Sequence, residues 1–273
     1  MKQFKNQVKE QQRAKLLTNW KSKRLYGQFL KVLDNATFDK IKTFDWLRPS
    51  KLKGVTEAYI MAAQEQALRT RNYDRHILKL EVDDKCRLCH SQTENITHII
   101  SGCSQLAQHE YILRHDKVCK YLHYNICLAL GMKPPVQKWY LEEPDPVITQ
   151  DNVTILYNQP VQTDRTINAN KPDIIVRDRK EKMCLIIDVA IPADMNIERK
   201  EAEKILKYKD LGIEIERMWN TTVKIIPIVI GALGVVPKSL KENLQSLPGK
   251  FSINRIQESA LLGTAYIMRK VGI

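Results

Sequence analysis

Four side chains that can ligate a metal ion lie within the stretch CRLCHSQTENITHIISGC, residues 86–103. The spacing C-x2-C-x8-H-x4-C is formed by Cys86, Cys89, His98 and Cys103. Two cysteines separated by two residues form a turn whose thiolates converge, while the histidine and last cysteine come from a helix start and the turn after it. Four protein ligands leave no position for water, so the pattern predicts a structural Zn²⁺ site. The alternative is a set of unrelated buried side chains.

Two aspartates interrupt apolar runs in KPDIIVRDRKEKMCLIIDVAIP, residues 171–192. A β-hairpin that turns at Lys180-Glu181 would place Asp173 directly opposite Asp188. Like charges about 5 Å apart are destabilising unless a cation lies between them, and carboxylates with open coordination positions suit Mg²⁺ or Mn²⁺. The alternative is a shifted turn, because a slip of one residue would put the two carboxylates on opposite faces of the sheet.

Lysines accompany an apolar helical stripe in the next segment, IERKEAEKILKYKDLGIEIERMW. The residues expected to face the sheet recur every three or four positions: Ala202, Ile205, Tyr208, Leu211, Ile215 and Met218. Lys200, Lys204 and Lys207 follow the same period beside them, so an ammonium group could stabilise charge on a phosphate. Alternatively, they are solvated lysines paired with neighbouring glutamates.

The elements that must position these groups fall into three regions. Residues 1–85 are predicted to form a basic α-helical region, with helices near 5–34 and 50–72. Residues 86–103 form the CCHC zinc knuckle. Residues 104–273 form an α/β domain, with a helix near 105–130 and strands near 153–157, 172–177, 183–191 and 223–231.

Composition limits the function classes. The chain has 273 residues, of which 43% are hydrophobic and 27% charged, so a folded core is expected and intrinsic disorder is not. The apolar run at 225–236 is short of the ~20 residues that span a bilayer, and no secretory signal opens the sequence. An intracellular protein without membrane partners and without disulfides is therefore expected.

Charge suggests the kind of partner. The net charge is +13, and residues 1–85 hold 19 Lys and Arg against 10 Asp and Glu. This asymmetry favours a polyanionic partner such as DNA or RNA, with a solvated lysine-rich surface as the alternative.

The order of these motifs resembles the C-terminal part of non-LTR retrotransposon proteins that carry a restriction-like endonuclease of the PD-(D/E)xK superfamily. The resemblance covers roughly residues 25–273. It rests on the knuckle, the Arg114-His115 pair in EYILRHDKV, the motifs KPDIIV and LIIDVA, the dipeptide KY, and the late IGALG.

The resemblance implies a restriction-endonuclease-like mixed sheet flanked by helices, and metal-dependent nicking of DNA. It implies Asp173 and Asp188 as ligands of Mg²⁺ or Mn²⁺, with Lys207 favoured over Lys204 as the third catalytic group. It also implies nucleic-acid binding by Arg114 and His115, a nuclear location, and a reverse transcriptase acting in trans.

Several features leave alternatives open. Ala190 stands two positions after Asp188, where many such nucleases have lysine, and Asp164 is a candidate further carboxylate. The competing functions are a non-catalytic nucleic-acid-binding protein with the same knuckle, and a structure-selective junction nuclease with the same core. His115, Cys119, His123 and Cys127 recur every four residues, but mixed core and surface positions are favoured over a second zinc site.

Overall fold

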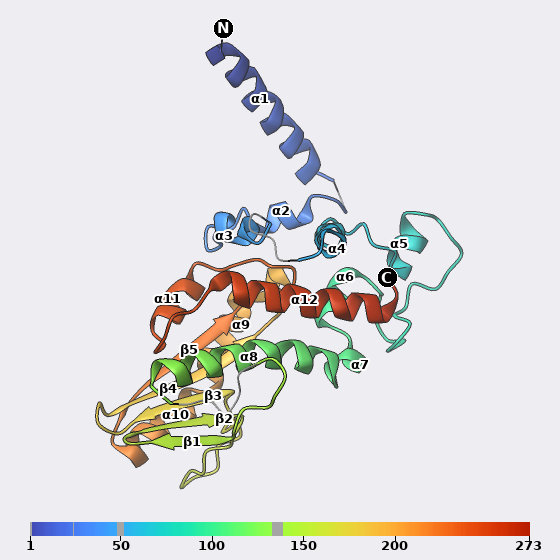
Figure 1. Cartoon of the computed structure of the whole chain (residues 1–273). Coiled ribbons are helices and arrows are strands. Elements are labelled where there is room, and N and C mark those ends of the chain that lie inside the picture. The colour runs from blue at the N-terminus through green and yellow to red at the C-terminus, as the bar shows by residue number, and fades with distance from the viewer. Residues whose placement is uncertain (1, 24, 48–51, 133–138) are drawn as a thin grey trace.

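A mixed β-sheet forms the lower part of the computed structural model in Figure 1, and the structure describes residues 2–23, 25–47, 52–132 and 139–273. Within these residues the sheet has the strand order β1-β2-β3-β4-β5. Its strands are β1 (Val147–Gln150), β2 (Val153–Tyr157), β3 (Ile174–Asp178), β4 (Met183–Ala190) and β5 (Thr222–Val229). The first three pairings are antiparallel, and β4 pairs with β5 in parallel. The predicted α/β class is confirmed.

The β3–β4 hairpin has the predicted register. Ile175 pairs with Ile186 and Ile174 with Ile187. The turn is fixed locally, because the Asp178 side chain accepts hydrogen bonds from the backbone N–H groups of Lys180 and Glu181. Strands lie at all four predicted places, whereas the exposed edge strand β1 was not expected.

The crossover between the two parallel strands is made by η1 (Asp194–Asn196), α9 (Ile197–Lys207) and α10 (Lys209–Trp219). One continuous helix was predicted, but the chain divides it at Tyr208. The predicted apolar stripe is right for Tyr208, Leu211 and Ile215, which are fully buried, and wrong for Ala202 and Ile205, which are exposed. The first half of the stripe fails because α9 points its lysines, not its apolar residues, at the end of β4.

Two long helices, α8 (Glu110–Ala129) and α12 (Ile253–Val271), lie side by side between the sheet and the front helices (Figure 1). The shorter helices complete this side of the molecule: α2 (Gln28–Val32), α3 (Lys40–Asp45), α4 (Gly54–Gln64), α5 (Arg71–His76), α6 (Ile96–Ser101), α7 (Ser104–Ala107) and α11 (Ser239–Gln245). One hydrophobic core runs from Phe29 to Val271, so it crosses the predicted boundary at residue 85.

The front region contacts the later part of the chain through polar side chains as well. Gln257 of α12 donates to the carbonyls of Thr43 and Gly234, and Gln64 donates to the carbonyl of Leu233. All three bonds are buried. They supply partners for carbonyls that would otherwise be buried without one.

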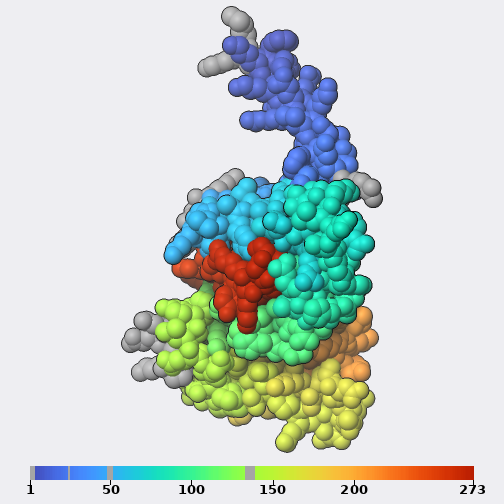
Figure 2. Space-filling model, turned by 90° about the vertical axis from the view of Figure 1, so that its right-hand side faces the viewer, coloured from blue at the N-terminus to red at the C-terminus, as the bar shows by residue number. Residues whose placement is uncertain are grey.

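Helix α1 (Lys2–Lys21) projects from the body and is attached to it at its end, where Trp20 donates to Glu65 and Lys21 pairs with Asp34 (Figures 1 and 2). The helix predicted at 5–34 is interrupted because the chain turns at Gly27, where φ is +74° and a Cβ atom would lie 2.4 Å from the carbonyl oxygen of Trp20. Among the described residues, no helix combines the length and apolar character that crossing a membrane requires.

Close packing of α8 on α12 depends on a glycine. A Cβ atom at Gly263 would lie 2.5 Å from Cγ of Arg114. The Arg114 side chain cannot move aside freely, because its guanidinium donates to Thr264 Oγ1 at 2.9 Å and to the Ile191 carbonyl at 3.1 Å. Glycine at this helical position is therefore a packing requirement.

We expect Gly263→Ala to lower the free energy of unfolding. The clash should cost about 1–3 kcal/mol after relaxation, which exceeds the gain of up to about 1 kcal/mol in helix propensity. Denaturant midpoints measured by circular dichroism provide the test. Gly54→Ala is the matched control, because no atom of the described residues lies within 4 Å of the added methyl group and the midpoint should stay equal or rise. A Gly263→Ala midpoint at or above that of the wild type would contradict the packing argument.

Candidate functional site

The four predicted knuckle ligands meet in one cluster. The donor atoms of Cys86, Cys89, His98 and Cys103 all lie within 4.8 Å of one another. The Cys86 and Cys103 sulfurs are 3.9 Å apart, and Cys89 Sγ lies 3.3 Å from His98 Nε2. As predicted, the cysteine pair lies in a turn, the histidine in the short helix α6, and Cys103 at the cap of α7. This cluster can hold a metal ion.

The environment of the cluster differs from one cysteine to the next. Cys86 and Cys103 are fully buried, and burial raises the pKa of the Cys86 thiol. A hydrogen bond from the Ser91 hydroxyl, together with nearby backbone N–H groups, lowers the pKa of Cys89 to about 5. Thiolate is the form that ligates metals, so Cys89 is prepared for this role before any ion binds.

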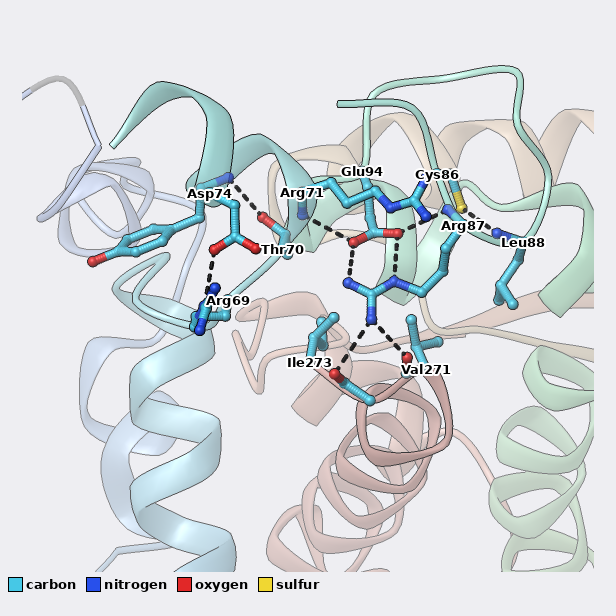
Figure 3. A network of polar contacts seen from close by, with 12 residues as sticks. Arg69, Thr70, Arg71, Asp74, Cys86, Arg87, Leu88, Glu94, Val271 and Ile273 are labelled. Carbon is cyan, nitrogen blue, oxygen red and sulfur yellow. Dashed lines mark hydrogen bonds and ion pairs between the residues drawn. The ribbon is translucent and has the colours of Figure 1, made fainter. Parts of the chain in front are cut away.

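A buried carboxylate, Glu94, fixes the knuckle to the rest of the protein (Figure 3). The Arg87 guanidinium contacts both of its oxygens, at 2.9 and 2.6 Å, and the backbone N–H of Arg71 donates to it at 3.0 Å. Burial alone would raise the pKa of Glu94, but the Arg87 contacts outweigh it and lower the pKa. Arg87 also donates to the carbonyl of Val271, at the end of α12.

The second predicted group, around Asp173 and Asp188, lies where the β3–β4 hairpin opens. Asp173 immediately precedes β3, and its Oδ2 accepts a hydrogen bond from the Val189 backbone N–H at 2.7 Å. The same oxygen lies 3.0 Å from Nε2 of His115 on α8. Burial opposes ionisation of Asp173, but His115 outweighs it and the pKa is lowered. Asp173 is therefore an oriented carboxylate.

Asp188 is held by the crossover helices. It is 2% exposed, and the Tyr208 hydroxyl donates to its Oδ1 at 2.6 Å. Its Oδ2 forms an ion pair with the Lys204 ammonium group, whereas Lys207 Nζ lies 3.9 Å from Oδ1. The sequence favoured Lys207 over Lys204; the structure brings both ammonium groups to this carboxylate and places Lys204 closer.

Arg114, expected to bind nucleic acid, is inside the protein. It is 3% exposed, and its hydrogen bonds go to Thr264 and the Ile191 carbonyl. Burial lowers its pKa to about 10. Its guanidinium joins α8 to α12 and to the chain after β4, while the residue also lines a surface hollow together with His115, so nucleic-acid binding by Arg114 stays a prediction.

His115 reaches the candidate site through its contact with Asp173, which the sequence did not predict, and its expected role in nucleic-acid binding stays a prediction. Its Nδ1 lies 3.0 Å from Asp116 Oδ1, so the ring stands between two carboxylates. Burial disfavours the imidazolium, but the negative groups around the ring outweigh burial and raise the pKa of His115. The other candidate carboxylate, Asp164, lies elsewhere and pairs with Arg217 at 2.6 Å on the surface.

A hollow of about 550 Å³ adjoins this group. It is lined by the chain after Asp188, including Ala190, and by His115, Arg199, Lys200 and Lys204. Sequence reasoning missed the basic contribution of Arg199, and it placed Tyr208 in the apolar stripe and in the KY dipeptide without giving its hydroxyl a role. The one available signal was the tyrosine hydroxyl at a fully buried position, which needs a hydrogen-bond partner.

Comparison with models of protein families and with curated proteins finds no match for the chain.

We expect Glu94→Gln to destabilise the knuckle and its contact with α12. The amide would leave the Arg87 guanidinium without its charge partner. Its NH2 group would also face a backbone N–H group that now donates to the carboxylate, so that hydrogen bond would be lost. A loss of about 2–3 kcal/mol is expected, less than for a fully buried pair because Arg87 keeps 29% of its side-chain exposure. Thermal unfolding and hydrogen exchange of residues 70–94 measure it. Glu81→Gln, on the exposed surface, is the control, and equal exchange in both variants would refute the proposed anchoring role.

Proposed function

We propose that this chain is a metal-dependent endonuclease module that nicks DNA. The observation that carries the proposal is the hairpin register, in which Asp173 and Asp188 flank the last pair, Ile174 and Ile187, on adjacent strands, with Lys204 and Lys207 beside Asp188. Two carboxylates on adjacent strands with an ammonium group at the edge are the groups that phosphodiester hydrolysis needs. The resemblance to restriction-like endonucleases of non-LTR retrotransposons supports the same reading.

The residues fit a hard divalent cation. Asp188 Oδ2 is buried and is paired with the Lys204 ammonium group, whose place a metal ion would take, and the hydrogen bonds of the Asp173 carboxylate involve Oδ2. Asp173 and Asp188 would hold Mg²⁺ or Mn²⁺, which would supply a bound water of lowered pKa and positive charge next to a phosphate.

The chain's own groups have separable roles in this proposal. Tyr208 and the Val189 N–H orient the two carboxylates. The Lys204 side chain would exchange its ion pair with Asp188 for one with a phosphate oxygen, and its ammonium group would stabilise the charge that develops there. Ala190 leaves the usual lysine position without an amine, and Lys204 and Lys207, from the following helix, take that place.

The basic surface provides the DNA contact. Arg199, Lys200 and Lys204 line the hollow beside the carboxylates. The projecting helix α1 contains six Lys and Arg residues and one acidic residue, Glu10. Phosphate contacts from such side chains give affinity without sequence preference. The corresponding partner is DNA, with RNA as a second polyanion and a reverse transcriptase acting in trans.

We also propose that the Cys86, Cys89, His98 and Cys103 cluster is a structural zinc knuckle. Three thiolates and one imidazole favour Zn²⁺ over Mg²⁺ or Ca²⁺. The cluster lies in a short, loop-rich segment, and Glu94 and Arg87 bind that segment to α12. Zinc would therefore stabilise an anchor and take no part in hydrolysis.

Purified protein is expected to retain about one zinc ion per chain after dialysis against a weak chelator. Cys86→Ser combined with Cys103→Ser should lose it, because a two-ligand remnant binds weakly. Cys184→Ala, which removes a buried cysteine of a different hydrophobic cluster that is not among the four ligands, should retain it. Elemental analysis by mass spectrometry gives the count. Zinc retained in full by the double variant would rule out these ligands.

Asp173→Asn and Asp188→Asn should each reduce Mg²⁺-dependent nicking of supercoiled plasmid by at least about 100-fold. Loss of a group that only supports a metal ligand typically costs about 10–100-fold in activity, and loss of a ligand itself should cost at least as much. Lys204→Ala should reduce the rate by about 10²–10³-fold with little loss of DNA binding, as expected for an interaction made mainly in the transition state.

Asp210→Asn and Lys209→Ala are the matched controls, because both side chains are exposed on α10. Circular dichroism and DNA-binding assays establish that each variant is folded. Nicking by Asp188→Asn at the wild-type rate would contradict the nuclease, and DNA binding without nicking by the wild type would favour the non-catalytic nucleic-acid-binding protein.

A further inference from the structure

A second cluster of metal-ligating atoms lies on α8, at its contact with the start of β3. Cys119 follows His115 by four residues, so both side chains emerge from one face of the helix. Cys119 Sγ lies 3.7 Å from His115 Nε2, and that nitrogen lies 3.0 Å from Asp173 Oδ2. The ligand atoms of His115, Cys119 and Asp173 are all within 4.8 Å of one another.

These distances suit a shared ion. Zinc bonds of about 2.0–2.3 Å in a tetrahedron separate the ligand atoms by about 3.3–3.6 Å, so small side-chain rotations would admit one. Cys119 is 1% exposed and its position is fixed by the helix, while Asp173 is fixed by the Val189 N–H. The site needs no rearrangement of the backbone.

The arrangement around His115 is the one found in many metal sites. When one ring nitrogen binds a metal, the other is usually protonated and donates to a carboxylate, which fixes the tautomer and the ring orientation. Asp116 Oδ1 lies 3.0 Å from His115 Nδ1 and is placed for this role. His115 therefore has a ligand position on one side and a supporting carboxylate on the other.

A cavity of about 220 Å³ opens on the same atoms. Its lining includes His115, Asp116, Cys119, Asp173 and the neighbouring Tyr157. Three protein ligands with an accessible fourth position are the composition of an open zinc site, in contrast to the closed four-ligand knuckle.

We propose that His115, Cys119 and Asp173 bind a thiophilic divalent cation of the zinc class, with a fourth position open to the cavity. The thiolate distinguishes this site from the Mg²⁺ site of the proposed function, because sulfur selects zinc-like ions and magnesium prefers oxygen alone. Both sites use the Asp173 carboxylate. It follows, on the basis of the proposed nuclease function, that zinc bound here inhibits nicking.

Metal binding is tested on the full chain, with Co²⁺ as the spectroscopic probe. Wild-type protein should take up two Co²⁺ ions per chain, and the weaker one should contribute its own thiolate-to-cobalt absorption. Cys119→Ser and His115→Gln should each bind one ion and lose the weaker phase, with the knuckle absorption unchanged. Cys184→Ala should bind two. His115→Gln is included because its side chain is partly exposed and its folding does not depend on a buried thiol.

The number of Co²⁺ ions bound decides the second metal site, whether or not the wild type nicks DNA. Uptake of only one ion by the wild type, or of two ions by both Cys119→Ser and His115→Gln, would overturn the second site. The functional consequence is measured as the ratio of nicking rates with and without micromolar free Zn²⁺, taken separately for each protein. That ratio should be about 0.1 or lower for the wild type and much closer to 1 for Cys119→Ser. If the wild type does not nick DNA, the ion count still decides the metal site, and only the nuclease proposal fails.

Discussion

A single buried guanidinium joins the parts of this protein that carry its polar chemistry. Arg114 of α8 donates to Thr264 of α12 and to the Ile191 carbonyl just beyond β4, and it is 3% exposed. A buried charge is costly unless it is hydrogen-bonded, so the fold must keep both Thr264 and the Ile191 carbonyl within reach of the guanidinium. They fix the position of α8, and with it the next residue, His115, which faces Asp173. Gly263 makes this arrangement sterically accessible.

The same constraint extends to the IGALG segment. Asp194, near the buried Arg114, accepts hydrogen bonds from the N–H groups of Leu233 and Val235. A Cβ atom at Gly231 would lie 2.1 Å from Asp194 Oδ1, so glycine is required for the chain to pass this carboxylate. Burial raises the pKa of Asp194 to about 6. The IGALG segment, η1 at the start of the crossover, and helices α8 and α12 thus meet at one buried polar cluster.

Local features were predictable from the sequence, and long-range packing was not. The knuckle ligands are close in the chain, and the β3–β4 register follows from a turn of a few residues, so both could be read directly. The interruption at Tyr208, the exposure of Ile205 and the burial of Arg114 depend on what lies opposite them in space. A hydrophobic period cannot show that Tyr208 turns towards Asp188, or that a guanidinium beside a candidate site carries the packing of two helices.

Charge balance at the hairpin opening limits how a metal ion could enter. Each carboxylate already has a cationic neighbour from a different helix, His115 for Asp173 and Lys204 for Asp188. Two unit charges 4 Å apart interact by about 4 kcal/mol near a protein surface, so a divalent ion placed among these cations would be repelled. A phosphate that attracts Lys204 would remove part of that repulsion and expose Asp188. Under the proposed function, phosphate and metal binding would therefore favour each other, and by linkage the effect would be equal in both directions.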